Sequence, residues 1–236
     1  MRENCYTCMR PKSSCMCPYV SPISTKTKFI ILIHPMEFKK IKNGTGVLTK
    51  LQLINSEIVV GLDFTKSKRV NEIIEDDGKE CYILYPGEDS INISRCETAE
   101  TFSSQKQRVV FILDATWPCA KKMIKLSRNL QALPFISFNN SKKSEFSIKQ
   151  QPHELCLSTI ESVKLVLDEF NRIGLEDAVT DSFLRPFKKM VEYQVACVLD
   201  PNNNNHHRVE RRKIRKKEFY KTNPQRALFY SKDNFG

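Results

Sequence analysis

The sequence predicts an α/β protein in which helices cover both faces of a mostly parallel sheet. Three observations support this fold class. Helical patterns alternate with short β-type runs, which lie at residues 28–34, 57–62, 81–85, 108–113 and 134–138. The run at 29–33 is continuously apolar, as is typical of a strand that is buried on both faces. A cysteine-rich start and a basic end then predict small appendages on one main domain.

The expected helices lie between and after these strands. Apolar residues at helical spacing indicate helices at about residues 43–53, 68–76 and 117–130. Ser158-Thr159-Ile160-Glu161 has the Ser-x-x-Glu spacing of a capping box, which predicts a helix from there to Phe170. A last helix is expected over residues 178–199, with a possible break at Pro186.

Composition divides the chain into a cysteine module (1–22), a main domain (23–200), and an Asn-rich linker with a basic tail (201–236). Between residues 208 and 236, ten Lys/Arg and three Asp/Glu give +7 of the formal net charge of +11. Such a charge block favours a nucleic-acid partner, although a purely solvated tail is the alternative. The residues predicted to bind the phosphate backbone of RNA are Arg208, Arg211, Arg212, Lys213, Arg215, Lys216 and Lys217.

The sequence argues against a membrane or secreted protein. Its longest apolar run, residues 29–33, is much shorter than the roughly 20 residues that cross a bilayer. The polar, cysteine-rich start lacks the apolar core of a signal peptide. Nine cysteines, four of them clustered, do not resemble a secreted disulfide framework. We therefore expect a cytoplasmic or nuclear protein.

Four cysteines near the start are the most specific signal for a metal. Cys5-x-x-Cys8 and Cys15-x-Cys17 provide four thiolates within thirteen residues, which suits a tetrahedral structural zinc site. A redox Cys-x-x-Cys would normally lie at the start of a helix beside a βαβ pattern, and nothing structured is expected before Cys5. With no open coordination position, such a zinc ion would stabilise the fold and take no part in catalysis.

Three short polar motifs follow expected strands. They are His34-Pro35-Met36-Glu37, Tyr85-Pro86-Gly87 and Asp114-Ala115-Thr116-Trp117. Taken singly, each has an ordinary structural interpretation, such as a turn, a helix cap or a core aromatic residue. The carboxyl ends of parallel strands meet at one edge of a sheet, where ligands bind in open α/β folds. Together the motifs predict one pocket.

In their order along the chain, these motifs resemble those of the DTW-domain family. The resemblance runs from residue 5 to about 170, and its motifs are Cys5-x-x-Cys8-x-Arg10-Pro11-x3-Cys15-x-Cys17, His34-Pro35-x-Glu37, Tyr85-Pro86, Asp114-x-Thr116-Trp117 and Ser158-Thr159-x-Glu161. Two departures are Lys149, where relatives often carry Arg, and Gly44, which separates Asn43 from Thr45.

The family is similar to tRNA-uridine aminocarboxypropyltransferases with a knotted SPOUT-like fold. The resemblance thus implies S-adenosylmethionine as the donor, N3 of a tRNA uridine as the acceptor and methylthioadenosine as a product. The chain would act on tRNA as a monomer or a homodimer, and no membrane association is expected. Two alternatives stay open: a zinc-containing RNA-binding protein without catalysis, and an RNA methyltransferase that uses the same donor.

Roles for the pocket residues follow from the chemistry that the resemblance implies. Asp114 is the candidate that accepts the N3 proton, with a role in holding the donor's amino group as the alternative. Thr116 is expected to hydrogen-bond the base or the carboxylate, and Trp117 to stack on the uracil or on the adenine. The residues expected to shape the donor pocket are His34, Pro35, Glu37, Thr45, Tyr85, Pro86, Gly87, Ser158, Thr159 and Glu161.

Overall fold

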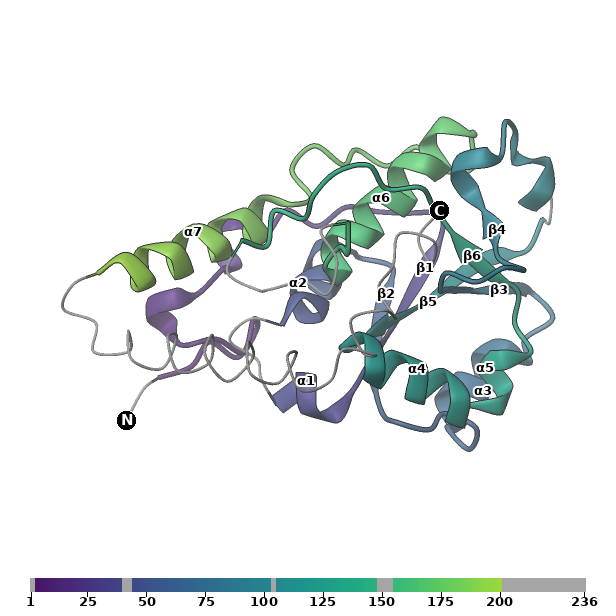
Figure 1. Cartoon of the computed structure of the whole chain (residues 1–236), viewed down its shortest axis with the longest axis horizontal. Helices are drawn as coiled ribbons and strands as arrows, with labels where there is room; N and C mark the ends of the chain where they lie inside the picture. The colour runs from purple at the N-terminus through teal and green to yellow at the C-terminus, as the bar shows by residue number, and fades with distance from the viewer. Residues whose placement is uncertain (1–2, 40–43, 103–104, 148–154, 201–236) are drawn as a thin grey trace, which may run out of the picture.

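A six-stranded sheet forms the centre of the molecule in the computed structural model, which describes residues 3–39, 44–102, 105–147 and 155–200 (Figure 1). The strand order is β2-β1-β5-β3-β6-β4, and every strand pair in these residues is parallel. The strands are β1 (Lys28–Ile33), β2 (Ser56–Val60), β3 (Lys79–Leu84), β4 (Ile91–Asn92), β5 (Gln107–Asp114) and β6 (Phe135–Ser137). This confirms the α/β class and the five expected strands, to which the structure adds the short strand β4.

Helices lie between the strands in the sequence, and two more come after the last strand. The α-helices are α1 (Pro35–Lys39), α2 (Thr45–Gln52), α3 (Lys68–Ile74), α4 (Trp117–Leu126), α5 (Arg128–Gln131), α6 (Thr159–Arg172) and α7 (Arg185–Leu199). Short 3-10 helices lie at Lys12–Ser14, Cys17–Tyr19, Ile93–Arg95 and Ala99–Phe102.

Two expected helices differ from the structure. The segment expected to be helical from residue 178 forms α7 only from Arg185, and Pro186 lies in its first turn instead of breaking it. Proline suits that position because the first turn needs no N–H donor from it. The single helix expected over 117–130 is divided into α4 and α5 at Ser127, whose backbone leaves helical geometry and whose hydroxyl accepts from the N–H of Phe64 at 2.9 Å.

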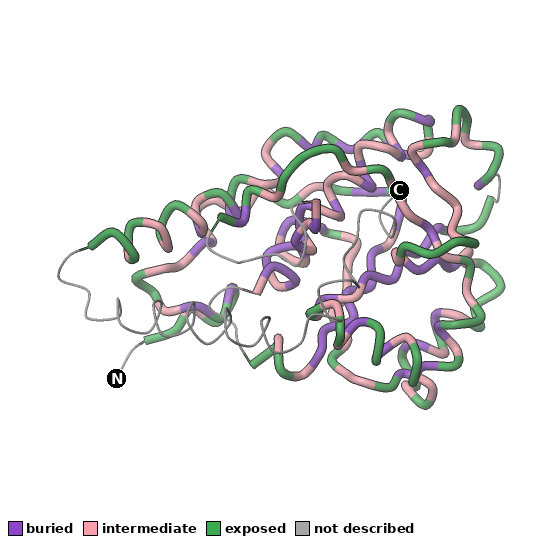
Figure 2. Tube along the Cα trace, in the orientation of Figure 1, coloured by how far each residue is buried: buried purple, intermediate pink, exposed green. Residues whose placement is uncertain are grey.

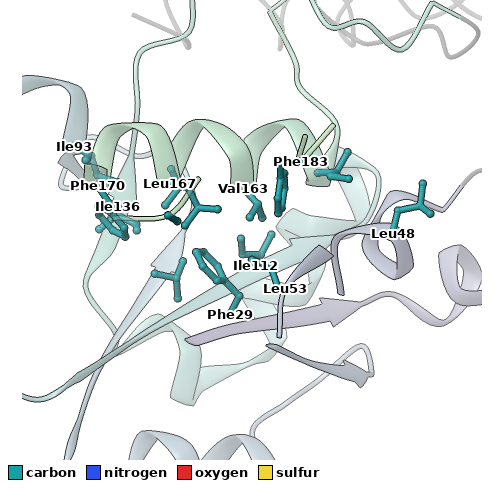
Figure 3. Close-up of a cluster of buried hydrophobic side chains, with 14 of the residues drawn as sticks. Phe29, Leu48, Leu53, Ile93, Ile112, Ile136, Val163, Leu167, Phe170 and Phe183 are labelled. Carbon is teal, nitrogen blue, oxygen red and sulfur yellow. The ribbon is translucent and has the colours of Figure 1, made fainter. Parts of the chain in front are cut away.

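One face of the sheet is covered by α2, α6 and α7 (Figure 1). Helix α6 lies across this face with Val163, Leu167 and Phe170 directed at the strands (Figure 3). They pack against sheet residues that include Phe29 and Ile112. Each of these five side chains is at most 3% exposed. The helical spacing of these apolar residues is what the sequence predicted for this segment.

The opposite face is covered by α3, α4 and α5, which confirms helices on both faces. Ile30 and Leu32 of β1 point to this face, whereas their neighbour Phe29 points to the other. Such alternation explains the unbroken apolar run in the sequence, because both sides of a central strand meet a helical layer. Helix α4 contributes the fully buried Met123, and α3 contributes Val70 and Ile73.

The N-terminal segment lies beside α7, at the end of the molecule away from β3 and β6 (Figure 1). Met16 joins the core beneath α6 and α7, so the cysteine module is docked on the main domain. Exposed positions gather on the outer side of α7 and in this segment (Figure 2). Among the described residues, no helix has the length and apolar character needed to cross a membrane.

Candidate functional site

The four clustered cysteines converge as their spacing predicted. The Sγ atoms of Cys5, Cys8, Cys15 and Cys17 all lie within 4.8 Å of one another. The Sγ atoms of Cys5 and Cys17 are 3.6 Å apart, and those of Cys8 and Cys15 are 3.7 Å apart. Thiolates at the corners of a tetrahedron about 2.3 Å from a zinc ion are separated by about 3.8 Å. The donor set and its geometry therefore fit a structural zinc ion.

The protein shifts the pKa values of these thiol groups in different directions. Backbone N–H groups of Cys8 and Thr7, and then the Cys17 side chain, lower the pKa of Cys5 to about 6. Burial raises the pKa of Cys15 and of Cys17. None of the nine cysteines forms a disulfide. The Cys5 thiol therefore ionises more readily than those of Cys15 and Cys17.

Arg10 follows the first cysteine pair and is buried at 2% exposure. Its Nη2 donates to the carbonyl oxygen of Gly44 at 3.3 Å and contacts Sδ of Met190 at 3.0 Å. Burial lowers the pKa of the Arg10 guanidinium, and the thiolate forms of the nearby Cys8 and Cys15 oppose this shift. Arg10 therefore joins the cysteine module to the residue before α2 and to α7.

Asp114 ends β5 at the carboxyl edge of the sheet and is 9% exposed. Its carbonyl oxygen accepts from the N–H of His34 at 3.1 Å, which ties the ends of β5 and β1 together. Gly46, in the first turn of α2, lies directly against the carboxylate. A Cβ added at Gly46 would overlap Asp114 Oδ2 and lie 2.9 Å from Asp114 Cγ and 3.0 Å from Ile33 Cδ1. Only glycine permits this approach.

Three helices begin around the Asp114 carboxylate. Thr159, the first residue of α6, donates from Oγ1 to Asp114 Oδ1 at 2.5 Å. The first turn of α2 abuts the carboxylate through Gly46, and α4 begins after its N-cap Thr116, two residues beyond Asp114. Helix N-termini carry partial positive charge and unpaired N–H groups. This edge therefore suits the charged carboxylate and a second anionic group from a ligand.

His34 lies at the end of the neighbouring strand β1 and is 8% exposed. Its Nδ1 accepts from the N–H of Met36 at 3.2 Å, so the proton of the neutral ring lies on Nε2. The carbonyl oxygen of His34 accepts from the N–H groups of Glu37 and Phe38 as α1 begins at Pro35. The His-Pro-x-Glu motif thus forms a tight turn next to Asp114, with Glu37 partly exposed.

Aromatic side chains line the same edge beside β3 and β6. The ring of Tyr85 lies 6.2 Å from that of Trp117 and 5.8 Å from that of Phe135, measured between centroids. Burial raises the pKa of Tyr85. Trp117 is only partly buried, and Pro86 and Gly87 are exposed in the following loop. Part of the aromatic surface therefore stays accessible to a planar ligand ring.

Glu161 has a defined structural partner set at the start of α6. Its Oε2 accepts from the N–H and the hydroxyl of Ser158, at 2.8 and 2.5 Å, and from the Ser144 hydroxyl at 2.8 Å. Its Oε1 accepts from the N–H of Glu145 at 2.7 Å. The capping box predicted from the sequence is present, and Glu161 also fastens the segment at 144–145 to α6.

The structure brings most of the expected pocket residues to one edge of the sheet. Thr45 is buried as the first residue of α2, and its carbonyl oxygen accepts from the Thr49 hydroxyl at 2.8 Å. Thr116 is exposed at the start of α4. The seven basic residues of the tail, and Lys149, lie outside the described residues.

Sequence reasoning missed two residues of this arrangement. Gly46 was not singled out, and a Thr-Gly pair at a helix start gives only a weak signal for a close approach. Arg10 was noticed as part of the cysteine motif, without the contact to Gly44 that places it under α2. Both depend on segments that are distant in the sequence, so spacing alone does not reveal them.

Comparisons with known proteins place the chain in a family. A tRNA-uridine aminocarboxypropyltransferase 2 from Mus musculus is 26% identical over 199 residues, which cover 82% of this chain and 64% of that protein. The corresponding protein of Drosophila melanogaster is 27% identical, with 82% and 76% covered. A tRNA-uridine aminocarboxypropyltransferase A from Arabidopsis thaliana is 26% identical over 217 residues, with 82% and 81% covered.

The chain thus spans less than two thirds of the length of the mouse protein. No solved structure gives a significant match to the chain. The model of the DTW domain matches residues 2–195, which is most of the sequence. The motifs at Asp114 and at the four cysteines lie within this match, and the chain belongs to the DTW domain family.

Proposed function

We propose that this protein transfers the 3-amino-3-carboxypropyl group of S-adenosylmethionine to N3 of a uridine in tRNA. The observation that carries the proposal is the buried Asp114 carboxylate, held by Thr159 where α2, α4 and α6 begin. The names of the relatives support the same reaction, since each is a tRNA-uridine aminocarboxypropyltransferase. The chain would therefore be an enzyme, with tRNA as its macromolecular substrate.

In the proposed reaction, a bond forms between uridine N3 and the γ-carbon of the donor, while the bond from that carbon to sulfur breaks. The electron pair of the broken bond stays on sulfur, so methylthioadenosine leaves as a neutral product. The N3 proton passes to the Asp114 carboxylate, which accounts for the charge on both sides. Choice of the arm over the methyl group needs only in-line placement of the γ-carbon, and no special reactive group.

The surroundings of Asp114 support this division of roles. The Thr159 hydroxyl fixes Oδ1 of Asp114, and Oδ2 lies against Gly46 at the start of α2, so the carboxylate has a defined orientation. The first turns of α4 and α6 suit the carboxylate of the donor. Tyr85 and Trp117 offer ring faces for uracil or adenine. His34, Pro35, Glu37 and Thr45 complete the pocket from β1 and α2, and Pro86 and Gly87 from the loop after β3.

The other segments would serve structure and substrate binding. We assign residues 1–22 to a zinc-stabilised module, residues 23–200 to the catalytic domain and residues 201–236 to a linker and RNA-binding tail. The proposal includes a knotted SPOUT-like arrangement of the catalytic domain. It is supported by the placement of β5 between β1 and β3, and by the return of the chain after β6 to Asp114.

Two labelled donors test the proposal. The full-length protein is incubated with tRNA and with S-adenosylmethionine labelled either in the methyl group or in the carboxyl carbon. We expect only the carboxyl label to enter RNA, with methylthioadenosine formed in equal amount. Transfer of the methyl label would favour the methyltransferase alternative. RNA binding without transfer of either label would favour the binding protein without catalysis.

A further inference from the structure

We infer that Arg10 is a positioning residue that couples the cysteine module to the Asp114 site through the first turn of α2. Arg10 lies two residues after Cys8, in the segment that the metal would order. It contacts the main domain at Gly44, and Gly46 lies against Asp114. The inference goes beyond the proposed reaction, because it assigns the module an influence on the catalytic edge of the sheet.

Charge explains why the module needs this arginine. Four thiolates around a divalent zinc ion carry a net charge of −2, and a cation beside a partly buried site of this charge is favourable. The Arg10 side chain is buried and electrostatically linked to Cys8 and Cys15. Groups of this kind, next to the ligands of a metal, commonly orient the ligands and tune the site. The backbone of Arg10 is held in the module, because its carbonyl oxygen accepts from the N–H of Cys5 at 2.7 Å.

The other end of the guanidinium fixes the start of α2. Arg10 Nη2 donates a hydrogen bond to the carbonyl oxygen of Gly44 at 3.3 Å. Gly44 is the N-cap residue of α2 and has no side chain that could cap the helix. Two residues later, Gly46 meets the Asp114 carboxylate with no room for a Cβ. A shift of this turn by a fraction of an ångström therefore moves Asp114 or opens a gap beside it. The contact is tight enough to transmit displacement.

The module has a second anchor, which makes Arg10 the specific link to the site. Tyr19 packs on α7, where Arg185 Cζ and Lys189 Nζ each lie 5.9 Å from its ring centroid. Arg10 also reaches α7 at Met190. Loss of the Arg10 side chain thus leaves the module docked on α7 through Tyr19 and Met16. The expected defect therefore lies at the start of α2 and beside Met190 in α7, with the rest of the docking contacts kept.

Hydrogen exchange of the full-length protein tests the coupling. The variants are Arg10→Met, which keeps length and apolar character but removes the donors, and Lys12→Met as a matched control. Lys12 is in the same module, its side chain is 62% exposed, and it forms an ion pair with Glu3 at the surface. Zinc content is measured by release to a chromogenic chelator. The exchange of peptides from residues 44–52 and from α3, on the opposite face, is measured by mass spectrometry.

We expect Arg10→Met to retain one zinc ion per chain while its 44–52 peptide exchanges about tenfold faster, as for a lost hydrogen bond to a charged group. The α3 peptide and the Lys12→Met protein should match the wild type. Removal of zinc from the wild type should accelerate the same peptide, and removal from Arg10→Met should add little. In the transfer assay, Arg10→Met should lower kcat about tenfold, and Arg10→Lys should restore part of it.

Unchanged exchange of residues 44–52 in zinc-loaded Arg10→Met would overturn the inference. If that variant loses zinc or unfolds, the zinc-free wild type provides the test instead. Normal protection of residues 44–52 from exchange in the zinc-free wild type would equally overturn the inference. Exchange and zinc content require neither donor nor tRNA. They therefore test the coupling even if the proposed transfer reaction proves wrong.

Discussion

Asp114 is a buried carboxylate with a fixed orientation. Thr159 holds one oxygen at 2.5 Å, and the missing side chain of Gly46 makes room for the other. A general base must be held near its proton, and a carboxylate at a strand end meets this need without a flexible side chain. The sequence predicted Asp114 and Thr159 from their motifs. It did not predict their contact, because the two residues are separated by 44 intervening positions.

Asp114→Asn separates the two roles considered for this residue. If Asp114 accepts the N3 proton, the variant should bind S-adenosylmethionine normally and lose about 10²–10⁴ in kcat, which is typical of a lost general base. Calorimetry gives the donor affinity, and single-turnover assays give the rate. Asp63→Asn, in an exposed turn, serves as the control. Loss of donor binding in Asp114→Asn would instead assign the residue to holding the donor.

Alanine substitutions at Gly46 and Gly87 test whether the close approach of α2 to Asp114 requires glycine, with Gly87 as the control. Gly46→Ala should lower the free energy of unfolding by about 1–3 kcal/mol, because the new methyl group overlaps the Asp114 carboxylate. Gly87→Ala should change stability little, since its Cβ would meet only Phe135 at 3.9 Å. Urea unfolding measures both. Equal stability of the two variants would mean that α2 yields easily and does not fix Asp114.

At the scale of helices and strands, the sequence predicted the features that depend on residues close together in the chain. The capping box at Ser158 and the apolar stripe of α6 both lie within a few residues, and the structure contains both. Strand β4 was missed because two residues carry no periodicity. The division between α4 and α5 depends on Ser127 accepting from Phe64, which is 63 positions away. Contacts of this kind override helix propensity.

An ion pair joins the edge strand β2 to α3 and predicts a pH dependence. Both oxygens of Glu57 accept from Arg69, at 2.6 and 2.8 Å, and this contact lowers the pKa of Glu57. A lowered folded-state pKa stabilises the protein above the ordinary value of about 4.3, and the gain is lost as the pH falls through the lowered value. The pair is partly exposed, so its contribution should be at most about 1 kcal/mol.

Glu57→Gln should therefore be about 0.5–1 kcal/mol less stable than the wild type at pH 7, and the difference should vanish near pH 3. Urea unfolding at several pH values gives the comparison, with Glu72→Gln as the control for a weaker contact at 3.4 Å to the same arginine. Metal release at low pH affects all three proteins and cancels in the difference. A constant difference down to pH 3 would show that charge is not the cause.

At the scale of the whole molecule, the basic tail should supply RNA affinity without taking part in the chemistry. Residues 208–217 contain seven basic side chains and one acidic one. Each neutralised phosphate adds a slope of roughly −0.7 to −0.9 in log K against log salt concentration. Removal of residues 208–236 should weaken tRNA binding and flatten that slope, while donor affinity stays unchanged. Filter binding over a salt series measures this, and an unchanged slope would place the RNA surface elsewhere.

Mass spectrometry of nucleosides from the product RNA tests the central claim most directly. The full-length protein is incubated with tRNA and S-adenosylmethionine, and the RNA is digested and compared with RNA treated with Asp114→Asn. The account predicts a uridine that has gained one 3-amino-3-carboxypropyl group at N3, formed by the wild type and nearly absent with the variant. A uridine that has gained only a methyl group, or RNA with no gain in mass despite bound donor, would contradict it.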